Sequence, residues 1–469
     1  MIMSESQIDI RVLEKEVYRY CCEFGREMLR AILKKVDDAL MLERDRQVYR
    51  HKGKRKAVLK TIMGEVEYER AIYRSEDENG AICHVYLLDE AVGLETVGFM
   101  SDMLAQRIAE TSCELSYRRT AETISNLTGQ SISHTGAWKV TQVLGERVDV
   151  AEREGAARAK SNQGRGAKET KLLFEEQDGV YLTLQGKDRK EMGKSAEMKL
   201  AIAYTGAIQT GTNRYNLTGK VACANFEGID GFYERKEGVI AAEYNVDEIE
   251  MRVFNGDGAG WMRRSITDET VHYQLDTYHR NKAILQYVAN PDARRYLFEL
   301  LYTKQIDLLL AVIKGFAASV GDEKERENYL KLLSYFQNNK DGLVSYKRRG
   351  LDLPPPEKDV VYRGCGAMES NVYSIIGRRM KNRRANWSIR GGNNLARLLT
   401  LKATGKLTEV LSGLVSIVLP PRYTEQVVTV LSAAKSPQRV GKGYTGFAQA
   451  AIPSSQKWMK DMLAFKPIW

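Results

Sequence analysis

Two acidic residues of this chain stand in strand-like segments and are each followed at once by glycine. Residues 172–184 have the hydrophobic and aromatic content of a β-strand, with Asp178 near its middle. Residues 251–259 indicate a second buried strand that ends at Asp257 in a glycine turn. Carboxylates on neighbouring strands can share divalent cations, and Glu369, which opens an amphipathic helix, could supply a third. The pattern therefore predicts a mixed core that brings three acids together.

Each of these acids also has an ordinary structural explanation. Asp-Gly is a common turn dipeptide, and a glutamate in the first turn of a helix is favourable to the helix dipole. Asp276 and His279 follow a further expected strand, and His279 could contact a scissile phosphate or orient a ligand. Alternatively, these two residues form a hydrogen-bonded pair that fixes the turn. Asp257 and Asp276 could also be the metal partners, with Glu369 left as a helix cap.

Composition favours a polyanionic partner. The chain has 469 residues and a formal net charge of +10, which is enough length for two to four structural units. It contains no apolar run of about 18 residues and no basic-then-apolar amino terminus, so we expect neither a membrane span nor a signal peptide. Its six cysteines show no C-x-x-C spacing. Reduced thiols in a cytoplasm are therefore expected, rather than a zinc site or disulfides.

Positive charge is concentrated next to the proposed third acid. Residues 370–408 contain nine Lys or Arg and no Asp or Glu. A cationic surface beside a metal site suits nucleic-acid phosphates, whereas a solvated basic helix face is the alternative. We expect phosphate contacts from Arg378, Arg379, Lys381, Arg383, Arg384 and Arg390. Trp387 is expected to stack on or wedge between bases, unless it belongs to the core.

The region before the acids indicates elements that bind DNA. Residues 1–45 predict an amphipathic helical arm for oligomerisation or DNA contact, and residues 46–96 predict a β-hairpin region. Residues 97–150 predict helices that end in a helix-turn-helix, with Gly129 in the turn and Ser133 as a cap. The outward residues of its second helix would face a major groove; they are His134, Thr135, Lys139 and Gln142. A helical hairpin that never contacts DNA is the alternative.

The rest of the chain predicts the element order βββαβαβα with one interruption. After a linker at 151–171, residues 172–290 supply the first part of this core, and residues 291–356 predict a helical insertion. Residues 357–400 would hold the last core helix and the basic segment, and residues 401–469 a C-terminal helical region. This order sets the first and fourth strands side by side, as in an RNase H-like α/β core.

These motifs together resemble those of DDE transposases of bacterial insertion sequences, specifically the ISLre-type group related to the Mutator-like superfamily. The likeness covers nearly the whole chain. It rests on residues 61–70, 86–94, 178–179, 199–206, 256–261, 276–279 and 369–387. The resemblance implies Asp178, Asp257 and Glu369 as a metal-binding catalytic triad, with Asp276 and His279 as an accessory motif. It thereby favours the triad over the pair of Asp257 and Asp276.

The activity implied by the resemblance is divalent-metal-dependent DNA cleavage and strand transfer, which together constitute transposition. Two Mg²⁺ ions, which Mn²⁺ could replace, would activate the attacking oxygen and stabilise the leaving oxygen. The expected partners are double-stranded DNA, as element ends and target, and further copies of the chain in a homodimer or larger oligomer. No membrane and no small-molecule substrate are expected, and the location would be the bacterial cytoplasm at the nucleoid. A sequence-specific DNA-binding regulator and a structure-selective nuclease without strand transfer are the alternatives.

Overall fold

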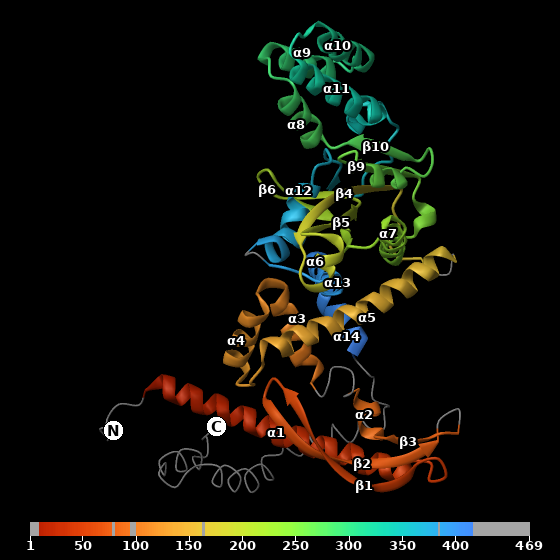
Figure 1. Ribbon diagram of the computed structural model, residues 1–469. Helices are drawn as coiled ribbons and strands as arrows, with labels where there is room; N and C mark the ends of the chain where they lie inside the picture. Colours follow the sequence, from red (N-terminus) through yellow and green to blue (C-terminus); the bar gives the residue numbers. More distant parts are fainter. Residues whose placement is uncertain (1–8, 77–79, 94–99, 162–164, 383–384, 416–469) are drawn as a thin grey trace. The chain divides into compact units, whose positions relative to one another are not determined.

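The computed structural model describes residues 9–76, 80–93, 100–161, 165–382 and 385–415. This part of the chain mixes helices with three β-sheets (Figure 1). The chain divides into two compact units: the first comprises residues 1–108, 118–137 and 415–469, and the second residues 109–117 and 138–414. The stretch expected to be one helix-turn-helix domain is therefore shared between the units. Most of the expected C-terminal helical region lies outside the described residues.

The first unit contains an antiparallel sheet covered by a long helix. Its strands, in spatial order, are β1 (Arg50–Thr61), β2 (Gly64–Glu76) and β3 (Ile82–Val85), and its helices include α1 (Ile10–Glu43) and α2 (Leu87–Val92). The second half of α1 packs on the sheet, where Leu33 and Val36 meet Val66. Buried Asp37 accepts a hydrogen bond from the Ala71 backbone N–H at 3.0 Å. The residues expected to form a helical arm and a hairpin thus lie in α1 and in β1–β2.

Three helices follow along the chain: α3 (Asp102–Glu114), α4 (Tyr117–Thr128) and α5 (His134–Lys160). Gly129 adopts a φ of +65°, which lets the chain turn after α4. The Ser133 hydroxyl caps α5, because it accepts a hydrogen bond from the Gly136 backbone N–H at 3.0 Å. The turn and cap lie where the sequence indicated them, but α5 runs for 27 residues. Residues 151–160, expected to be linker, are helical because their alanines and long charged side chains favour helix.

The second unit is built on a five-stranded sheet with the order β10-β9-β4-β5-β8. Its strands are β4 (Leu172–Thr183), β5 (Ser195–Tyr204), β8 (Val221–Asn225), β9 (Met251–Gly256) and β10 (Val271–Leu275). β5 pairs antiparallel with both β4 and β8, whereas β9 pairs in parallel with both β4 and β10. The five strands follow one another along the chain as expected, but only the 3₁₀ turn η2 (Gly260–Ser265) lies between β9 and β10, where the expected order βββαβαβα has a helix. Additions are helix α6 (Gly186–Met192) and a small sheet of β6 (Gly206–Gly211), β7 (Arg214–Thr218) and β11 (Val360–Val361).

Helices pack on both faces of this sheet. They are α7 (Ile229–Glu243), α12 (Met368–Asn371), which continues as the π-helical segment η5 (Val372–Lys381), and α13 (Ile389–Ala403). The helix α14 (Leu407–Val415) follows α13 along the chain. Alternate residues of a strand face opposite sides. Glu175 pairs with Lys236 of α7 at 2.6 Å, so its side of β4 faces α7. Glu176 accepts a hydrogen bond from the Ala367 N–H at the start of α12, so Asp178, two residues on, faces the α12 side.

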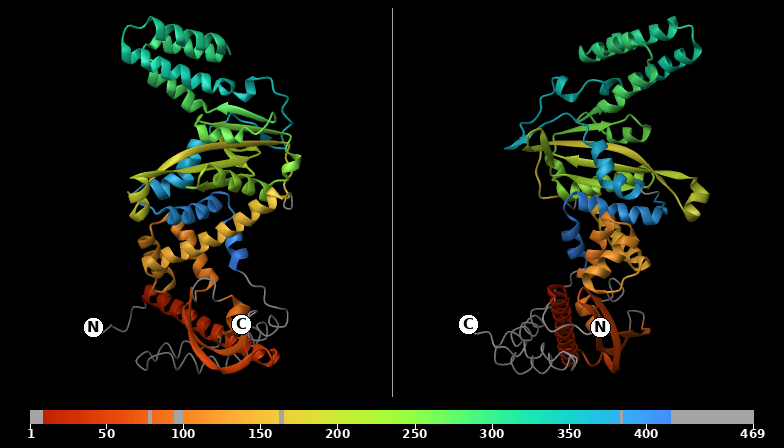
Figure 2. Two further views of the ribbon diagram at one scale, coloured as in Figure 1. Left: turned by 45° about the vertical axis from the view of Figure 1, so that its right-hand side comes forward. Right: turned by 90° about the vertical axis from the view of Figure 1, so that its left-hand side faces the viewer.

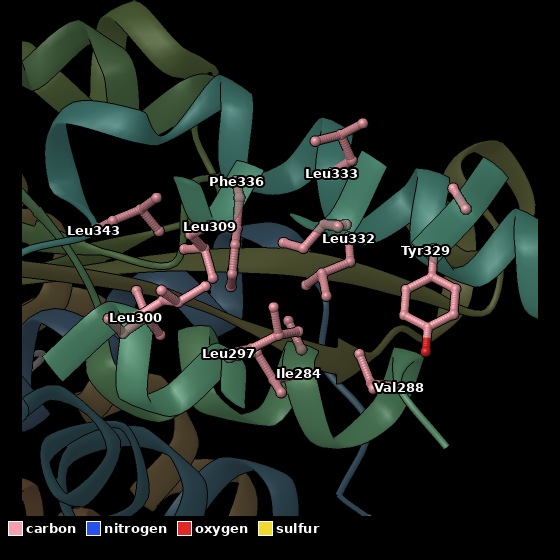
Figure 3. Packing of buried hydrophobic residues seen from close by; sticks show 14 of the residues in the cluster. Ile284, Val288, Leu297, Leu300, Leu309, Tyr329, Leu332, Leu333, Phe336 and Leu343 are labelled. Atoms are coloured by element: carbon pink, nitrogen blue, oxygen red, sulfur yellow. The ribbon is translucent and has the colours of Figure 1, made fainter. Parts of the chain in front are cut away.

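A helical insertion lies beyond the β10 edge of the sheet (Figure 2). It follows α8 (Thr277–Tyr287) and consists of α9 (Pro291–Tyr302), α10 (Ile306–Ser319), α11 (Glu323–Asn338) and the short 3₁₀ turns η3 (Lys340–Gly342) and η4 (Tyr346–Arg348). Its hydrophobic core includes Leu297, Leu309 and Phe336, and it also takes in Leu275 of β10 and Ile284 of α8 (Figure 3). The insertion therefore holds β10 and α8 in place. Two further 3₁₀ turns, η1 (Val246–Glu248) and η2 (Gly260–Ser265), flank β9.

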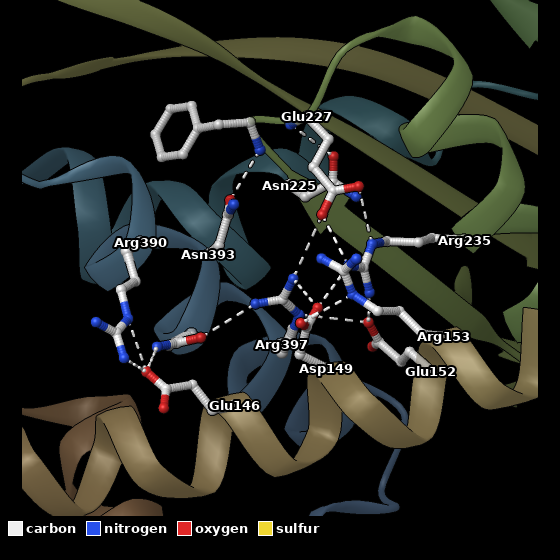
Figure 4. Close-up of polar contacts among 12 residues, drawn as sticks. Glu146, Asp149, Glu152, Arg153, Asn225, Glu227, Arg235, Arg390, Asn393 and Arg397 are labelled. Carbon is white, nitrogen blue, oxygen red and sulfur yellow. Dashed lines mark hydrogen bonds and ion pairs between the residues drawn. The ribbon is translucent and has the colours of Figure 1, made fainter. Parts of the chain in front are cut away.

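A buried charge cluster fastens α5 to the helices of the sheet (Figure 4). We define it as Asp149 and Glu152 of α5, Glu227, Arg235 of α7 and Arg397 of α13. Both arginines lie 2.5 Å from the Asp149 carboxylate, and they are only 4% and 5% exposed. Burial raises the pKa of Glu152 against the opposing effect of the arginines. Burial would also raise the pKa of Asp149, but Arg397 and Arg235 outweigh it and the pKa is lowered.

Candidate active site

Asp178 and Asp257 lie side by side because their strands are parallel neighbours. The ladder between β4 and β9 ends at the pair Glu176–Asn255, and each acid stands two residues further along its strand. The ladder between β9 and β10 ends one residue before Asp276. Three adjacent strands therefore deliver three acids to one edge of the sheet.

Backbone groups fix the orientation of two of these carboxylates. Oδ1 of Asp178 accepts a hydrogen bond from the Gly179 N–H at 2.7 Å, and Oδ1 of Asp257 accepts one from the Ala259 N–H at 2.8 Å. Gly258 adopts a φ of +87°, in the region that favours glycine. Gly258 thus shapes the site, because its conformation lets the chain turn back toward the Asp257 carboxylate. Gly179 lies within β4, where a Cβ would collide with the Glu197 side chain.

A cavity of about 150 Å³ brings the predicted site residues together. Asp178, Asp257, Asp276, His279 and Glu369 all line it. Oxygens of Asp178 and Asp257 and a ring nitrogen of His279 lie within 4.8 Å of one another. Glu369 reaches the cavity from α12 and is exposed. Residues that are far apart in the sequence therefore line one cavity, although Glu369 does not belong to the group of described residues whose ligand atoms lie within 4.8 Å of one another.

Asp276 acts on the cavity mainly through His279. Its side chain caps α8 by accepting a hydrogen bond from the His279 backbone N–H at 3.0 Å, and it also lies 3.0 Å from Nδ1 of the same residue. This hydrogen bond raises the pKa of His279, against the effect of burial. Burial alone would raise the pKa of Asp276, but the hydrogen bonds from His279 and Asn255 lower it. The pair therefore fixes the turn, as the structural interpretation of the sequence expected, and it also orients the imidazole. A contact of His279 with a phosphate or a ligand stays a prediction.

The acids that line the cavity give it a negative charge that no described Lys or Arg side chain compensates. Among the described residues, no Lys or Arg forms an ion pair with Asp178, Asp257 or Glu369. Burial raises the pKa of Asp178, with a further contribution from the nearby carboxylates and an opposing one from His279. Clustered carboxylates repel one another unless a cation lies between them. The site thus favours a cationic ligand.

Sequence reasoning missed Glu176, a fully buried carboxylate that holds the start of α12. It accepts hydrogen bonds from the backbone N–H groups of residues 366, 367 and 368 at 2.9, 3.1 and 3.2 Å. The Tyr204 hydroxyl donates to it at 2.6 Å. Burial raises the pKa of Glu176, although these hydrogen bonds favour its ionised form. The signal in the sequence was a polar run at 175–177 inside a buried strand, because buried polar groups need partners.

One amide side chain connects this carboxylate to the other side of the cavity. Nδ2 of Asn255 donates to Glu176 at 3.0 Å and to Asp276 at 3.1 Å. The network therefore links the helix that carries Glu369 to the residue that orients His279.

Acids from other elements partly neutralise the basic segment. Arg378 pairs with Glu114 of α3, and Arg390 pairs with Glu146 of α5 at 2.5 Å. Their side chains remain 56% and 79% exposed. Arg379 donates to the Ser112 carbonyl at 2.7 Å, and Lys381 is exposed. Arg383 and Arg384 lie outside the described residues. The lack of acids within 370–408 did not reveal these pairings, since the acids are far away in the sequence.

Trp387 belongs to the core and is not free to stack on bases. It is 6% exposed, and its indole N–H donates to the Met380 carbonyl at 2.8 Å. The expectation of a base-stacking role is therefore wrong, and the alternative interpretation of a core tryptophan holds.

The residues expected to face a major groove do not all face outward. Gln142 is 7% exposed, and its side-chain oxygen accepts a hydrogen bond from Nδ2 of Asn394 at 2.9 Å. A Cβ at Gly145 would lie 2.6 Å from the Asn394 carbonyl oxygen, so α13 approaches α5 closely there. Packing of α13 thus covers Gln142, and its expected outward position is wrong. His134, Thr135 and Lys139 are exposed.

Comparison with known proteins places the chain in a family. The model of an uncharacterised protein family (UPF0236) matches residues 3–411. A UPF0236 protein of Caldanaerobacter subterraneus subsp. tengcongensis is 24% identical over 398 residues, which are 83% of this chain and 77% of that protein. A UPF0236 protein in the vanSb 3′ region of Streptococcus gallolyticus is 22% identical over 407 residues, or 84% and 83% of the two chains.

Within the described residues, no helix is both long enough and apolar enough to cross a membrane. The family match extends from the first unit through the acid-lined cavity to α14. The chain belongs to the uncharacterised protein family UPF0236.

Proposed function

We propose that the chain is a DDE-type transposase with an RNase H-like core, which cleaves DNA at the ends of an insertion sequence and joins those ends to target DNA. The observation that carries the proposal is the cavity that Asp178, Asp257 and Glu369 line without a Lys or Arg partner among the described residues. The elements that bring them there, two parallel neighbouring strands and a later helix, fit the arrangement that the sequence motifs imply.

The donor set fits a hard divalent cation. Carboxylate oxygens suit Mg²⁺ and Mn²⁺, and Asp178, Asp257 and Glu369 would hold the ions. Bound ions would make the oxygen of water or of a DNA 3′-hydroxyl more nucleophilic and would stabilise the leaving oxygen. No protein nucleophile is then needed. Thr277, Tyr278 and Cys365 also line the cavity, but burial raises the pKa of the Cys365 thiol and so disfavours its thiolate form.

The protein's own groups orient the reacting parts. The N–H groups of Gly179 and Ala259 hold the two aspartates. Asp276 occupies Nδ1 of His279 and so leaves Nε2 for the cavity. A raised pKa favours the protonated imidazole, which would donate a hydrogen bond to a phosphate oxygen. Exposed cations on the α12–η5 side, Arg378 and Lys381, would hold flanking phosphates.

The names of the relatives support a mobile element. The name of one relative in Caldanaerobacter joins eleven designations, and that of another joins four. Several copies of one protein within a genome are the expected outcome of transposition. The net charge of +10 on this chain agrees with a DNA partner.

The test is an assay of DNA cleavage and joining. Purified chain is incubated, with and without Mg²⁺ or Mn²⁺, with labelled duplexes that carry the boundaries of the DNA segment encoding it and with a target plasmid. We expect metal-dependent cleavage and joined products. Asp178→Asn, Asp257→Asn and Glu369→Gln should each lower the rate more than about 100-fold, since even residues that only support metal ligands cost 10–100-fold. Asp352→Asn removes an exposed acid outside the cavity and serves as the matched control.

Each other result selects a different function. Cleavage without joined products would indicate a nuclease. Binding without cleavage under any metal condition would indicate a DNA-binding regulator. Full activity in any one of the three variants would remove that acid from the proposed triad.

A further inference from the structure

A second and larger cavity lies on the other side of the segment that precedes α12. Its volume is about 790 Å³, and it shares Cys365 and Gly366 with the acid-lined cavity. The hairpin β6–β7, the end of α7 and the turn between α13 and α14 complete its walls. Pockets of 300–1,000 Å³ hold small organic ligands. This cavity is therefore large enough for one nucleotide, whereas a base-paired duplex is too wide to enter it.

The charge in this cavity has the opposite sign to that of the acid-lined one. Its charged lining residues are Lys220, Arg363, Lys406 and Glu243. Lys406 pairs with Glu243, so Lys220 and Arg363 remain as the other two cations of the lining. Nζ of Lys220 donates to the Asn371 side chain at 3.2 Å, and no carboxylate pairs with it within the described residues. A half-buried ammonium without a carboxylate partner points to an anionic ligand.

An aromatic ring and a guanidinium form a stacked wall beside this ammonium. The guanidinium carbon of Arg363 lies 3.9 Å from the centre of the Tyr215 ring, and both residues line the cavity. Planar groups of this kind are where unpaired bases stack in nucleic-acid-binding proteins. The cavity thus offers partners for both parts of a nucleotide, its phosphate and its base.

The ridge between the two cavities is low. Gly364 and Gly366 are exposed, and Gly366 adopts a φ of +128°. A Cβ at either glycine would meet no atom within 4 Å, so the space beside the ridge is open. A DNA strand can therefore lie close to the backbone here as it passes from one cavity to the other.

We propose that the larger cavity binds an unpaired nucleotide of the DNA strand whose neighbouring phosphate lies in the acid-lined cavity, with its phosphate on Lys220 and its base against Arg363 and Tyr215. This inference rests on the proposed function for its substrate. Extracting the nucleotide from a duplex costs a few kcal/mol, so the cavity favours ends that are frayed or already single-stranded. It would hold the strand in register for cleavage beside it.

Binding to two duplexes tests the proposal. In an Asp178→Asn background, which prevents cleavage, affinity is measured for a blunt duplex and for the same duplex with a short single-stranded overhang. We expect Lys220→Met and Arg363→Gln each to weaken binding of the overhang about tenfold while leaving the blunt duplex nearly unchanged. Lys358→Met, which removes an exposed lysine outside the cavity, is the matched control.

Two further measurements separate a binding role from a structural one. Lys220→Met should melt at the same temperature as its parent or higher, because burial lowers the pKa of Lys220 and the charged form is therefore disfavoured in the folded protein. Free deoxyadenosine monophosphate should bind much more weakly than the overhang; comparable affinity would mean a cavity for free nucleotides. Equal losses on both duplexes, or none on either, would also overturn the proposal.

Failure of this inference can be distinguished from failure of the proposed function. If the triad variants retain cleavage while Lys220→Met still weakens overhang binding, the nucleotide cavity stands and the assignment of the acids falls. If the triad variants lose cleavage but Lys220→Met and Arg363→Gln bind both duplexes normally, only the inference about the cavity falls.

Discussion

The charge cluster gathers three carboxylates in the second unit and the acid-lined cavity gathers four, but the two sites balance them differently. In the charge cluster, Arg235 and Arg397 lie between Asp149, Glu152 and Glu227. In the cavity, no Lys or Arg among the described residues pairs with the triad. Carboxylates that the protein neutralises with its own guanidiniums serve cohesion. Carboxylates left without a cationic side chain are available for an external cation, and this difference supports the proposed active site.

The largest expected effect on stability comes from unbalancing the charge cluster. Arg397→Met should lower the free energy of unfolding by about 3–5 kcal/mol, because it leaves three partly buried carboxylates with Arg235 as their shared cation. Arg390→Met, at the exposed pair with Glu146, should cost less than about 1 kcal/mol. Denaturant unfolding of both variants measures the contrast. Similar losses in the two variants would show that the cluster does not hold α5 to the sheet.

The loss in Arg397→Met should also depend on pH. In the wild type, Arg397 lowers the pKa of Asp149 and opposes the rise in the pKa of Glu152. Without it both folded-state pKa values increase, and a carboxyl with a raised folded-state pKa contributes stability that is lost as pH rises. We therefore expect a larger deficit at pH 7 than at pH 5. Unfolding curves at the two pH values test this, and a deficit that grows on acidification would contradict the assignment.

The acid-lined cavity should respond to metal where the charge cluster does not. Mg²⁺ or Mn²⁺ should raise the melting temperature, since a ligand at 100 times its Kd stabilises by about 2.7 kcal/mol. Asp257→Asn should lose most of this increment, whereas Arg397→Met, although less stable, should keep it. EDTA should reverse the effect. An unchanged increment in Asp257→Asn would place the metal elsewhere.

Glu176 tests whether a carboxylate without a catalytic role can still control the cavity. Glu176→Gln replaces one acceptor oxygen with an amide that cannot accept the N–H groups at the start of α12. We expect cleavage to fall about 10–100-fold and the metal concentration for half-maximal rate to rise. Tyr204→Phe removes one donor to the same carboxylate and should have a smaller effect in the same direction. A normal rate and metal requirement in Glu176→Gln would leave Glu176 a purely structural residue.

Short-range patterns predicted much of the site because strand pairing converts sequence motifs into geometry. The segments around Asp178 and Asp257 had the marks of strands, and parallel pairing of β4 with β9 places their acids together. The turn at Gly129 and the cap at Ser133 were likewise local features, set by φ and by one hydrogen bond.

The errors concern partners that are remote in sequence. The helical pattern placed Gln142 on an outward face, but α13 covers it. The basic context of Trp387 indicated a role in DNA binding, but Trp387 lies in the core. Glu176 gave no signal beyond its polarity, since its partners lie on other segments, from Tyr204, 28 residues further on, to Gly366, 190 residues further on. The pattern of residues within a segment indicates which faces the segment has. It does not indicate which other segment will pack on those faces.

The smallest expected effects are those of the exposed cations that would contact DNA phosphates. Arg378 remains 56% exposed despite its pairing with Glu114, and Lys381 is exposed on the same helical segment. Replacing both with alanine should weaken binding to every duplex alike and lower the slope of log K against log salt by about one unit for each lost contact. Lys139→Ala should instead reduce the preference for element ends over random DNA, because a good base contact contributes about 1–3 kcal/mol of discrimination. Titrations across a salt series on both kinds of duplex distinguish the two outcomes.

Lys314→Ala, which removes an exposed lysine of α10, controls for net charge. If that variant lowers the salt slope as much as the loss of Arg378 and Lys381, the cations beside Glu369 have no special place in DNA binding. The contrast between neutralised and available charge would then hold for the acidic side chains of this protein but not for its Lys and Arg side chains.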